Sequence, residues 1–188
     1  DSENGIAGVD FSLLRLSQEF KNRSSLGVLF VDKSSELSAE DNQTYAIDGR
    51  LGLGDEWTLS GYVAQTYTPG LSGDDKAMRM RVDFNVTSLD AHLAYAKVGD
   101  NFNPEVGFLR RKNYEKISTM IWHRKRMNDR WGLFELRPHV FFRGYQDDEG
   151  FYESGFLHID NHWEWTSGFE VHTGLNFIRE GGQEPFEI

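Results

Sequence analysis

Apolar and polar residues alternate one by one along the segment 76–87. The apolar residues are Met78, Met80, Val82, Phe84 and Val86, and the polar ones are Arg79, Arg81, Asp83, Asn85 and Thr87. Because successive side chains of a strand point to opposite faces, the segment is predicted to be a strand with one apolar and one polar face. Such a strand lies between an apolar phase and a watery one.

Segments of this kind recur along the whole chain. They are Ile6–Leu16, Leu26–Asp32, Thr44–Leu53, Trp57–Thr66, Ala77–Thr87, Leu89–Val98, Glu115–Arg126, Trp131–Arg143, Tyr152–Trp165 and Phe169–Ile178. The pattern predicts an all-β fold, an antiparallel up-and-down β-barrel or a segment of a larger barrel, with about ten strands. It leaves open whether the apolar side meets a protein core or lipid.

Short and long connections alternate between these segments. The short ones are Gly54-Asp55, Thr87-Ser88, Asn128-Asp129 and Thr166-Ser167, and the long ones are Lys33–Gln43, Tyr67–Asp75, Gly99–Tyr114 and Gly144–Phe151. Outer-membrane barrels have short turns on one side and long loops on the other. A soluble meander can show the same order by chance, so the alternation favours a membrane barrel without excluding the soluble alternative.

Aromatic residues gather at the ends of the expected strands, with most Trp near the short turns and most Tyr beside the long loops. Tyr and Trp prefer the depth of lipid headgroups, so two such bands are typical of a membrane barrel. The alternative is that they cap the core of a soluble sheet. Trp131 falls on the polar phase of its expected strand. Pro138 removes a ladder donor, so that strand is expected to be bulged, at an edge or interrupted.

Composition narrows the class of protein further. The 188 residues suit one domain, and an aromatic content of 14% argues against disorder. The absence of cysteine removes disulfides, thiol nucleophiles and thiolate metal sites. No apolar run reaches about 18 residues, so no transmembrane helix is predicted. The net charge of −10 argues against nucleic acid as a partner.

The stretch Gly99-Asp-Asn-Phe-Asn-Pro-Glu-Val-Gly-Phe-Leu-Arg-Arg111 resembles a motif of a bacterial family of unknown function. Members of that family join a carbohydrate-binding-family-9-like module to a C-terminal outer-membrane-type barrel. Gly5–Asp10 and Glu184–Ile188 look like flanking parts of the same barrel region. The resemblance implies the outer membrane of a Gram-negative bacterium, a lipid bilayer as partner and a glycan or small solute. It also implies that residues 1–188 are a single barrel-type domain inside a longer chain.

The same motif is expected to form an ordered loop. Pro104 favours an extended Asn103, and Gly107 can adopt dihedrals closed to other residues. Asn101 and Asn103 can bond backbone groups. One interpretation is a loop that folds inward and lines a pore, which makes Asn101, Asn103 and Glu105 candidates for ligand binding. The alternative is a structural loop that only holds the connection together.

Basic residues supply a second set of candidates. A channel opposite acidic loops could be lined by Arg79, Arg81, Arg110, Arg111, Arg124, Lys125 and Arg126, which gives the transverse charge separation of water-filled barrels. The alternative is that these are solvated charges of the sheet. Arg79 and Arg81 are retained as ligand-binding candidates.

His158, Asp160, His162 and Glu164 are expected on one face of one strand, with Glu170 and His172 on the next. Imidazole and carboxylate ligate divalent metals. Residues two apart on a strand are separated by roughly 7 Å, and a chelate needs ligands from several strands. We therefore predict no metal, keep His158 and His162 as candidate ligands, and favour a hydrated polar face.

No catalytic constellation and no cofactor motif is found in the sequence, so an enzyme is disfavoured and no cofactor is predicted. Two functions remain. The first is part of an outer-membrane β-barrel for passage or surface handling of a glycan-related solute. The second is a soluble β-domain that acts as a binding or accessory module of a carbohydrate-active protein.

Overall fold

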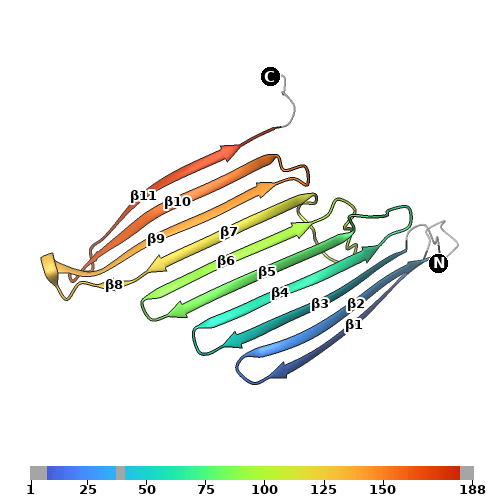
Figure 1. The fold of residues 1–188 in the computed structure, drawn as a ribbon, viewed down its shortest axis with the longest axis horizontal. Helices are drawn as coiled ribbons and strands as arrows, with labels where there is room; N and C mark the ends of the chain where they lie inside the picture. Colours follow the sequence, from blue (N-terminus) through green and yellow to red (C-terminus); the bar gives the residue numbers. More distant parts are fainter. Residues whose placement is uncertain (1–7, 37–40, 183–188) are drawn as a thin grey trace. The chain divides into compact units, whose positions relative to one another are not determined.

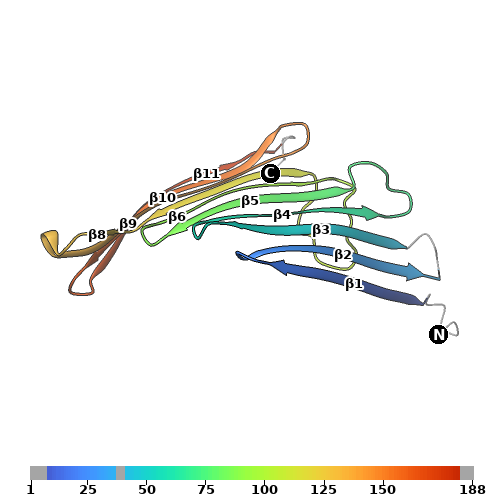
Figure 2. The same cartoon turned by 60° about the horizontal axis from the view of Figure 1, so that its bottom comes forward.

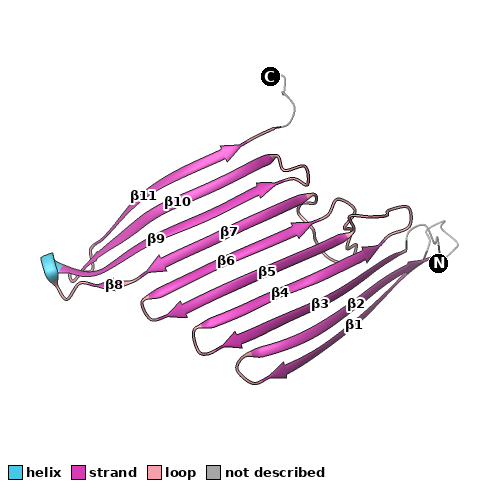
Figure 3. Ribbon diagram, viewed as in Figure 1, coloured by secondary structure: helices cyan, strands magenta, loops and turns pink. Residues whose placement is uncertain are grey.

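The computed structural model describes residues 8–36 and 41–182. About 70% of the chain is strand, and one short 3-10 turn, η3 (Arg130–Gly132), is the helical segment seen in Figure 3. The strands are β1 (Val9–Phe20), β2 (Ser24–Ser35), β3 (Asn42–Leu53), β4 (Trp57–Tyr67), β5 (Lys76–Val86), β6 (Leu89–Val98), β7 (Tyr114–His123), β8 (Lys125–Arg126), β9 (Leu133–Gln146), β10 (Tyr152–Trp165) and β11 (Glu170–Glu180).

All strands belong to one antiparallel up-and-down sheet of 11 strands, whose order follows the sequence (Figure 1). Only β8 lies off this path, paired with β9. The sheet is not closed, and β1 and β11 are the two ends of the pairing order within the described residues. The predicted all-β antiparallel fold with about ten strands is therefore confirmed, as an open segment of sheet.

The predicted strand bounds agree closely with the structure. Leu89–Val98 and Tyr152–Trp165 coincide with β6 and β10, whereas the first strand begins and ends later in the chain than expected. Two of the predicted short turns contain residues with positive φ, Gly54 (62°) in one and Asn128 (48°) and Asp129 (59°) in the other, and Gly168 (83°) directly follows Thr166-Ser167. These dihedrals suit the Gly, Asn and Asp residues from which the turns were predicted.

Trp131 is an exception to the predicted pattern. It lies in η3 with φ 61°, before β9 begins, so its expected place on the polar phase of a strand is wrong. The short turn at Asn128-Asp129 extends through η3, and both its residues also have positive φ. Local turn chemistry has overridden the alternation there.

Pro138 lies inside β9, opposite Asn161 of β10. On the other side of β9, the pairing with β7 ends at Trp122↔His139, and the pairing with β8 begins at Lys125↔Leu136. The neighbouring strand is therefore broken where Pro138 offers no N–H. β9 itself is continuous, so the interruption expected in the strand of Pro138 is wrong. The break falls in the neighbouring strand, where the predicted single segment Glu115–Arg126 is divided into β7 and β8.

The chain forms two compact units, each made of several segments. The first comprises Asp1–Gly52, Leu59–Met80 and Ala96–Tyr114, and the second Leu53–Thr58, Arg81–Tyr95 and Glu115–Ile188. The ends of the resemblance, Gly5–Ala7 and Glu184–Ile188, and part of the long connection Lys33–Gln43 lie outside the described residues. Among the described residues, no helix is long and apolar enough to cross a membrane.

The first unit has a small core between the sheet and a loop. The β6–β7 loop, residues 99–113, crosses one face of the sheet beside β3, β4 and β5 (Figure 2). Phe102 of this loop is buried against Ala64, Ala77 and Val98. Small side chains on neighbouring strands make room for the aromatic ring, so this face of the sheet is shaped to receive the loop.

Candidate functional site

The two faces of the first unit are inverted relative to a soluble sheet. One face carries apolar rows that cross β1, β2 and β3, such as Leu16–Val28–Ile47, and these side chains are exposed, Ile47 by 60%. The opposite face carries polar residues that are buried, and Asn42 and Thr66 are each only 2% exposed. A soluble protein normally buries the apolar face of a sheet. A contiguous exposed apolar surface of this kind marks contact with another apolar surface, of protein or of lipid.

The second unit shows the same separation in four adjacent strands. The register places Ile121, Val140, Ile159 and Leu175 in one row across β7, β9, β10 and β11. Of these, Ile121, Ile159 and Leu175 are exposed. The next row on the other face contains Trp122, His139, Asp160 and Gly174. In these rows each unit therefore has an exposed apolar face and an opposite polar face, although Phe11 and Leu13 of β1 and Ile178 of β11 are exposed on the opposite face.

Asn42 joins the polar face of the first unit to the β6–β7 loop. Its Nδ2 donates to the backbone oxygen of Asn103 at 2.8 Å and to Oγ1 of Thr68 at 2.8 Å. Its Oδ1 accepts from the backbone N–H of Glu105 at 3.3 Å. Thr66 completes the attachment, because its Oγ1 accepts from the N–H of Asn103 at 3.0 Å. The side chains of Asn42 and Thr66 thus satisfy backbone N–H and C=O groups of the loop that, in a sheet, a neighbouring strand would satisfy.

Asn101 attaches the loop to the preceding β4–β5 loop, residues 68–75. Its side chain donates to the backbone oxygen of Gly73 at 2.9 Å, and its N–H donates to the backbone oxygen of Asp74 at 3.1 Å. Gly99 is required at this crossing, because a Cβ there would lie 2.0 Å from the backbone oxygen of Asp74. The side chain of Asn101 thus bonds backbone groups of the β4–β5 loop rather than local ones, and the side chain of Asn103 bonds Glu105 instead of a backbone group.

Glu105 crosses from the loop to β2, where its Oε2 lies 2.6 Å from Nζ of Lys33. Its Oε1 accepts from Nδ2 of Asn103 at 3.2 Å. Beyond Glu105 the loop turns outward at Gly107 (φ 145°), and Phe108 is 85% exposed. The candidate residues 101, 103 and 105 therefore fix the loop, and Phe108 is the large side chain that it presents to its surroundings.

The structure does not bring Arg79 and Arg81 to the loop through any described contact. Arg81 forms a bidentate pair with its strand neighbour Asp83, with Nε 2.8 Å and 2.9 Å from the two carboxylate oxygens. Arg79 has no ion pair among the residues that the structure describes. The backbone of Arg79 closely approaches Gly61, where a Cβ would lie 2.4 Å from its oxygen.

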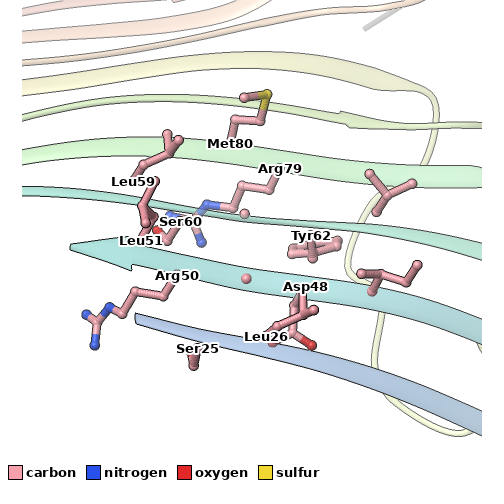
Figure 4. A pocket seen from close by; sticks show the side chains of 14 residues that line it. Ser25, Leu26, Asp48, Arg50, Leu51, Leu59, Ser60, Tyr62, Arg79 and Met80 are labelled. Atoms are coloured by element: carbon pink, nitrogen blue, oxygen red, sulfur yellow. The ribbon is translucent and has the colours of Figure 1, made fainter. Parts of the chain in front are cut away.

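Two shallow hollows, of about 560 and 520 Å3, lie on the apolar face of the first unit. Figure 4 shows the first, which is lined by residues of β2, β3, β4 and β5. Gly49 and Gly61 contribute no side chains there, and apolar side chains form the walls. These are Leu26, Ile47, Leu51, Leu59, Val63 and Met80. Few polar groups border either hollow, so they suit hydrocarbon better than a polar solute.

Histidines gather on the polar face of the second unit. His139 of β9, His158 and His162 of β10 and His172 of β11 lie in adjacent rows, with Asp160 between them. His162 stacks on His172 with ring centroids 3.6 Å apart, and Trp122 stacks on His139 at 4.1 Å. The predicted common face of His158, Asp160 and His162 is confirmed by the register, and His139 is added to it.

Arg137 neutralises the acidic side of this cluster. Its guanidinium hydrogen-bonds Glu170 and lies 3.4 Å from Glu164 and 3.7 Å from Glu135. Arg126 also pairs with Glu135, at 3.0 Å. The carboxylates of Glu135, Glu164 and Glu170 therefore all have an arginine partner. The contacts of Asp160, in contrast, are to His158 and His162.

Sequence reasoning missed Asn42, Thr66, Phe102 and His139 as residues that build these sites. The alanines at 46, 64 and 77 on successive strands signalled a face that something covers, although their alignment depends on register. His139 follows Pro138 directly, and the expected break in that strand hid its alternation with Arg137. Each omission therefore comes from information that only the pairing of strands supplies.

Comparison of the chain with protein-family models, curated proteins and solved structures finds no match.

Proposed function

We propose that this chain supplies strands to an outer-membrane β-barrel through which, or at whose surface, a glycan-related solute is handled. The observation that carries the proposal is the inversion of the two faces. In each unit the exposed face is apolar, whereas in the first unit the buried residues lie on the polar face. This is the arrangement that lipid outside and water inside would stabilise.

The β6–β7 loop supports a role in passage. It lies across the polar face of the first unit and is fixed there by Asn42, Thr66 and Lys33. A loop bound to the inner wall of a barrel narrows the lumen and places its own side chains along the path of a solute. In this proposal Phe108 and the neighbouring basic residues Arg110 and Arg111 are the loop side chains that a solute meets.

The ends of the sheet support a barrel with further strands. Every residue of β1 is exposed, including Leu13 and Leu14, whose side chains point to opposite faces. A long apolar edge strand in water is a site of aggregation, and in lipid its free N–H and C=O groups have no partner. Both problems are solved if additional strands pair with β1 and β11.

The solute class rests on the sequence resemblance to a family that carries a carbohydrate-binding module. The residues around the loop are compatible with it. Exposed Phe108 offers an aromatic face, and the guanidinium of the nearby exposed Arg110 is a hydrogen-bond donor of the kind that recognises hydroxyls. No catalytic role is proposed for any of these residues.

Cell fractionation of the natural full-length protein tests the proposal. We expect the protein in the membrane fraction, solubilised by detergent but not by salt or alkali. Its migration on a gel should also change on heating, as folded barrels unfold. Recovery of the folded protein from the soluble fraction without detergent would contradict the proposal and support the soluble binding module instead.

A further inference from the structure

The histidine cluster on the polar face of the second unit has the composition of a metal site. His139, Asp160 and His162 each offer one ligand atom, and these atoms lie within 4.8 Å of one another. Nε2 of His162 is 3.5 Å from Oδ2 of Asp160. Ligand atoms about 2.0–2.2 Å from a tetrahedral Zn²⁺ lie about 3.3 Å apart, so this separation already fits.

The carboxylate of Asp160 is buried and incompletely hydrogen-bonded. Its side chain is 9% exposed, and its Oδ1 is buried without a hydrogen bond. Its Oδ2 faces His158 at 3.7 Å and His162 at 3.5 Å, both longer than hydrogen bonds. No Lys or Arg pairs with Asp160 among the described residues. An unpaired carboxylate in this position is costly, and a cation between it and the imidazoles would satisfy it.

Hydrogen bonds at the outer side of the rings orient the imidazoles for binding. Nδ1 of His139 lies 3.1 Å from the backbone oxygen of Arg137, which can only accept, so this nitrogen carries the proton. Nδ1 of His158 likewise lies 2.6 Å from Oδ1 of Asn176. Both contacts leave the lone pair on Nε2. Histidines that ligate metals commonly donate their second N–H in this way.

Space beside Asp160 is kept open by Gly174, which lies directly opposite it on β11. A Cβ at position 174 would come within 3.2 Å of Cγ of Asp160. Any larger side chain there would cover the carboxylate, so the glycine leaves room for an ion and its water.

We infer that His139, Asp160 and His162 bind a divalent transition-metal ion of the zinc type, with His158 as the nearest further imidazole. The neighbouring group of His162, Glu170 and His172 is less suited, because Arg137 already binds Glu170. Two imidazoles and one carboxylate, without thiolate, match the ligands of Zn²⁺ sites that keep an open position. The site does not depend on whether the apolar face meets lipid.

Zn²⁺ titration of the chelator-treated full chain, followed by calorimetry, tests the assignment. We expect one ion per chain, and Asp160→Asn and His162→Gln should each weaken binding by more than the roughly 10–100-fold that loss of an outer-shell partner causes. Glu170→Gln should weaken binding by no more than such an outer-shell loss, because among the proposed ligands Glu170 reaches only Nδ1 of His162, at 3.4 Å. His123→Gln removes a histidine outside the cluster and should bind as the parent does. Circular dichroism of each variant checks that it is folded.

A second measurement needs no change to the ligands. Trp122 stacks on His139, so Cu²⁺ bound at the site should quench its fluorescence. The quenching should be saturable in the parent chain, be displaced by excess Zn²⁺, and be reduced in Trp122→Phe. The assignment is overturned if the parent binds no Zn²⁺ at millimolar concentration. It is also overturned if Glu170→Gln abolishes binding while Asp160→Asn retains it.

Discussion

Nδ2 of Asn42 donates to the backbone oxygen of Asn103 at 2.8 Å, which fixes the β6–β7 loop to the polar face of the sheet. Asn42 is 2% exposed and also accepts from the N–H of Glu105. We predict that Asn42→Ala destabilises the fold by about 1–3 kcal/mol, because it leaves buried backbone groups of the loop unpaired. Hydrogen exchange of residues 99–113 should rise selectively.

Gln43→Ala is the matched control for this prediction. Gln43 lies next to Asn42, on the opposite face, where its side chain bonds Asp32 and Tyr45. Its loss should leave exchange in the loop unchanged. If both variants release the loop equally, Asn42 is not its specific anchor.

Truncation of two phenylalanines of the same loop should change the free energy of unfolding by very different amounts. Phe102 is 6% exposed and packs against Ala64, Ala77 and Val98, whereas Phe108 is 85% exposed. Phe102→Ala should lower the free energy of unfolding by about 3–5 kcal/mol, and Phe108→Ala should change it by less than about 0.5 kcal/mol. Denaturant unfolding of both variants measures the difference, and equal effects would exclude this packing.

Gly99 and Gly49 differ in the space that a Cβ atom would have at each position. A Cβ at Gly99 would lie 2.0 Å from the backbone oxygen of Asp74, whereas at Gly49 the nearest atom would be 3.5 Å away. Gly99→Ala should therefore destabilise the chain by about 1–3 kcal/mol, and Gly49→Ala should be tolerated. Thermal unfolding followed by circular dichroism compares them, and a stable Gly99→Ala variant would show that the two loops do not cross this closely.

Arg137 is predicted to be the most important basic residue of the second unit. Its guanidinium serves Glu135, Glu164 and Glu170, so Arg137→Met should cost about 1.5–3 kcal/mol. Arg124→Met removes a more exposed single pair with Asp90 and should cost no more than about 1 kcal/mol. Urea unfolding of both variants under identical conditions ranks their losses of stability. A larger loss for Arg124→Met than for Arg137→Met would contradict the proposed network.

Strand positions could be predicted from the sequence because alternation is a local property. The segments 89–98 and 152–165 needed only the period of two, and turns such as Thr166-Ser167 needed only their residue types. The prediction that Trp131 lies in a strand was wrong, because Trp131 has a positive φ and belongs to η3, before β9 begins.

The sites were less predictable because they depend on register between distant segments. Asn42 and Asn103 are 61 positions apart, and no local pattern indicates that they meet. His162 was recognised on the polar face of its strand, but its approach to His139 requires the pairing of β9 with β10. The same alternation is compatible with lipid or with a protein core, so alternation alone does not identify the environment of the apolar face.

Lipid contact at Ile47 tests the central claim most directly. The chain has no cysteine, so Ile47→Cys and Asp48→Cys can each carry one fluorophore, on adjacent residues of opposite faces. In bilayers whose acyl chains carry a quencher, we expect strong quenching at position 47 and little at 48, where a water-soluble quencher should act instead. If position 47 is unquenched by lipid and also shielded from water, the apolar face lies against protein and the membrane proposal is wrong.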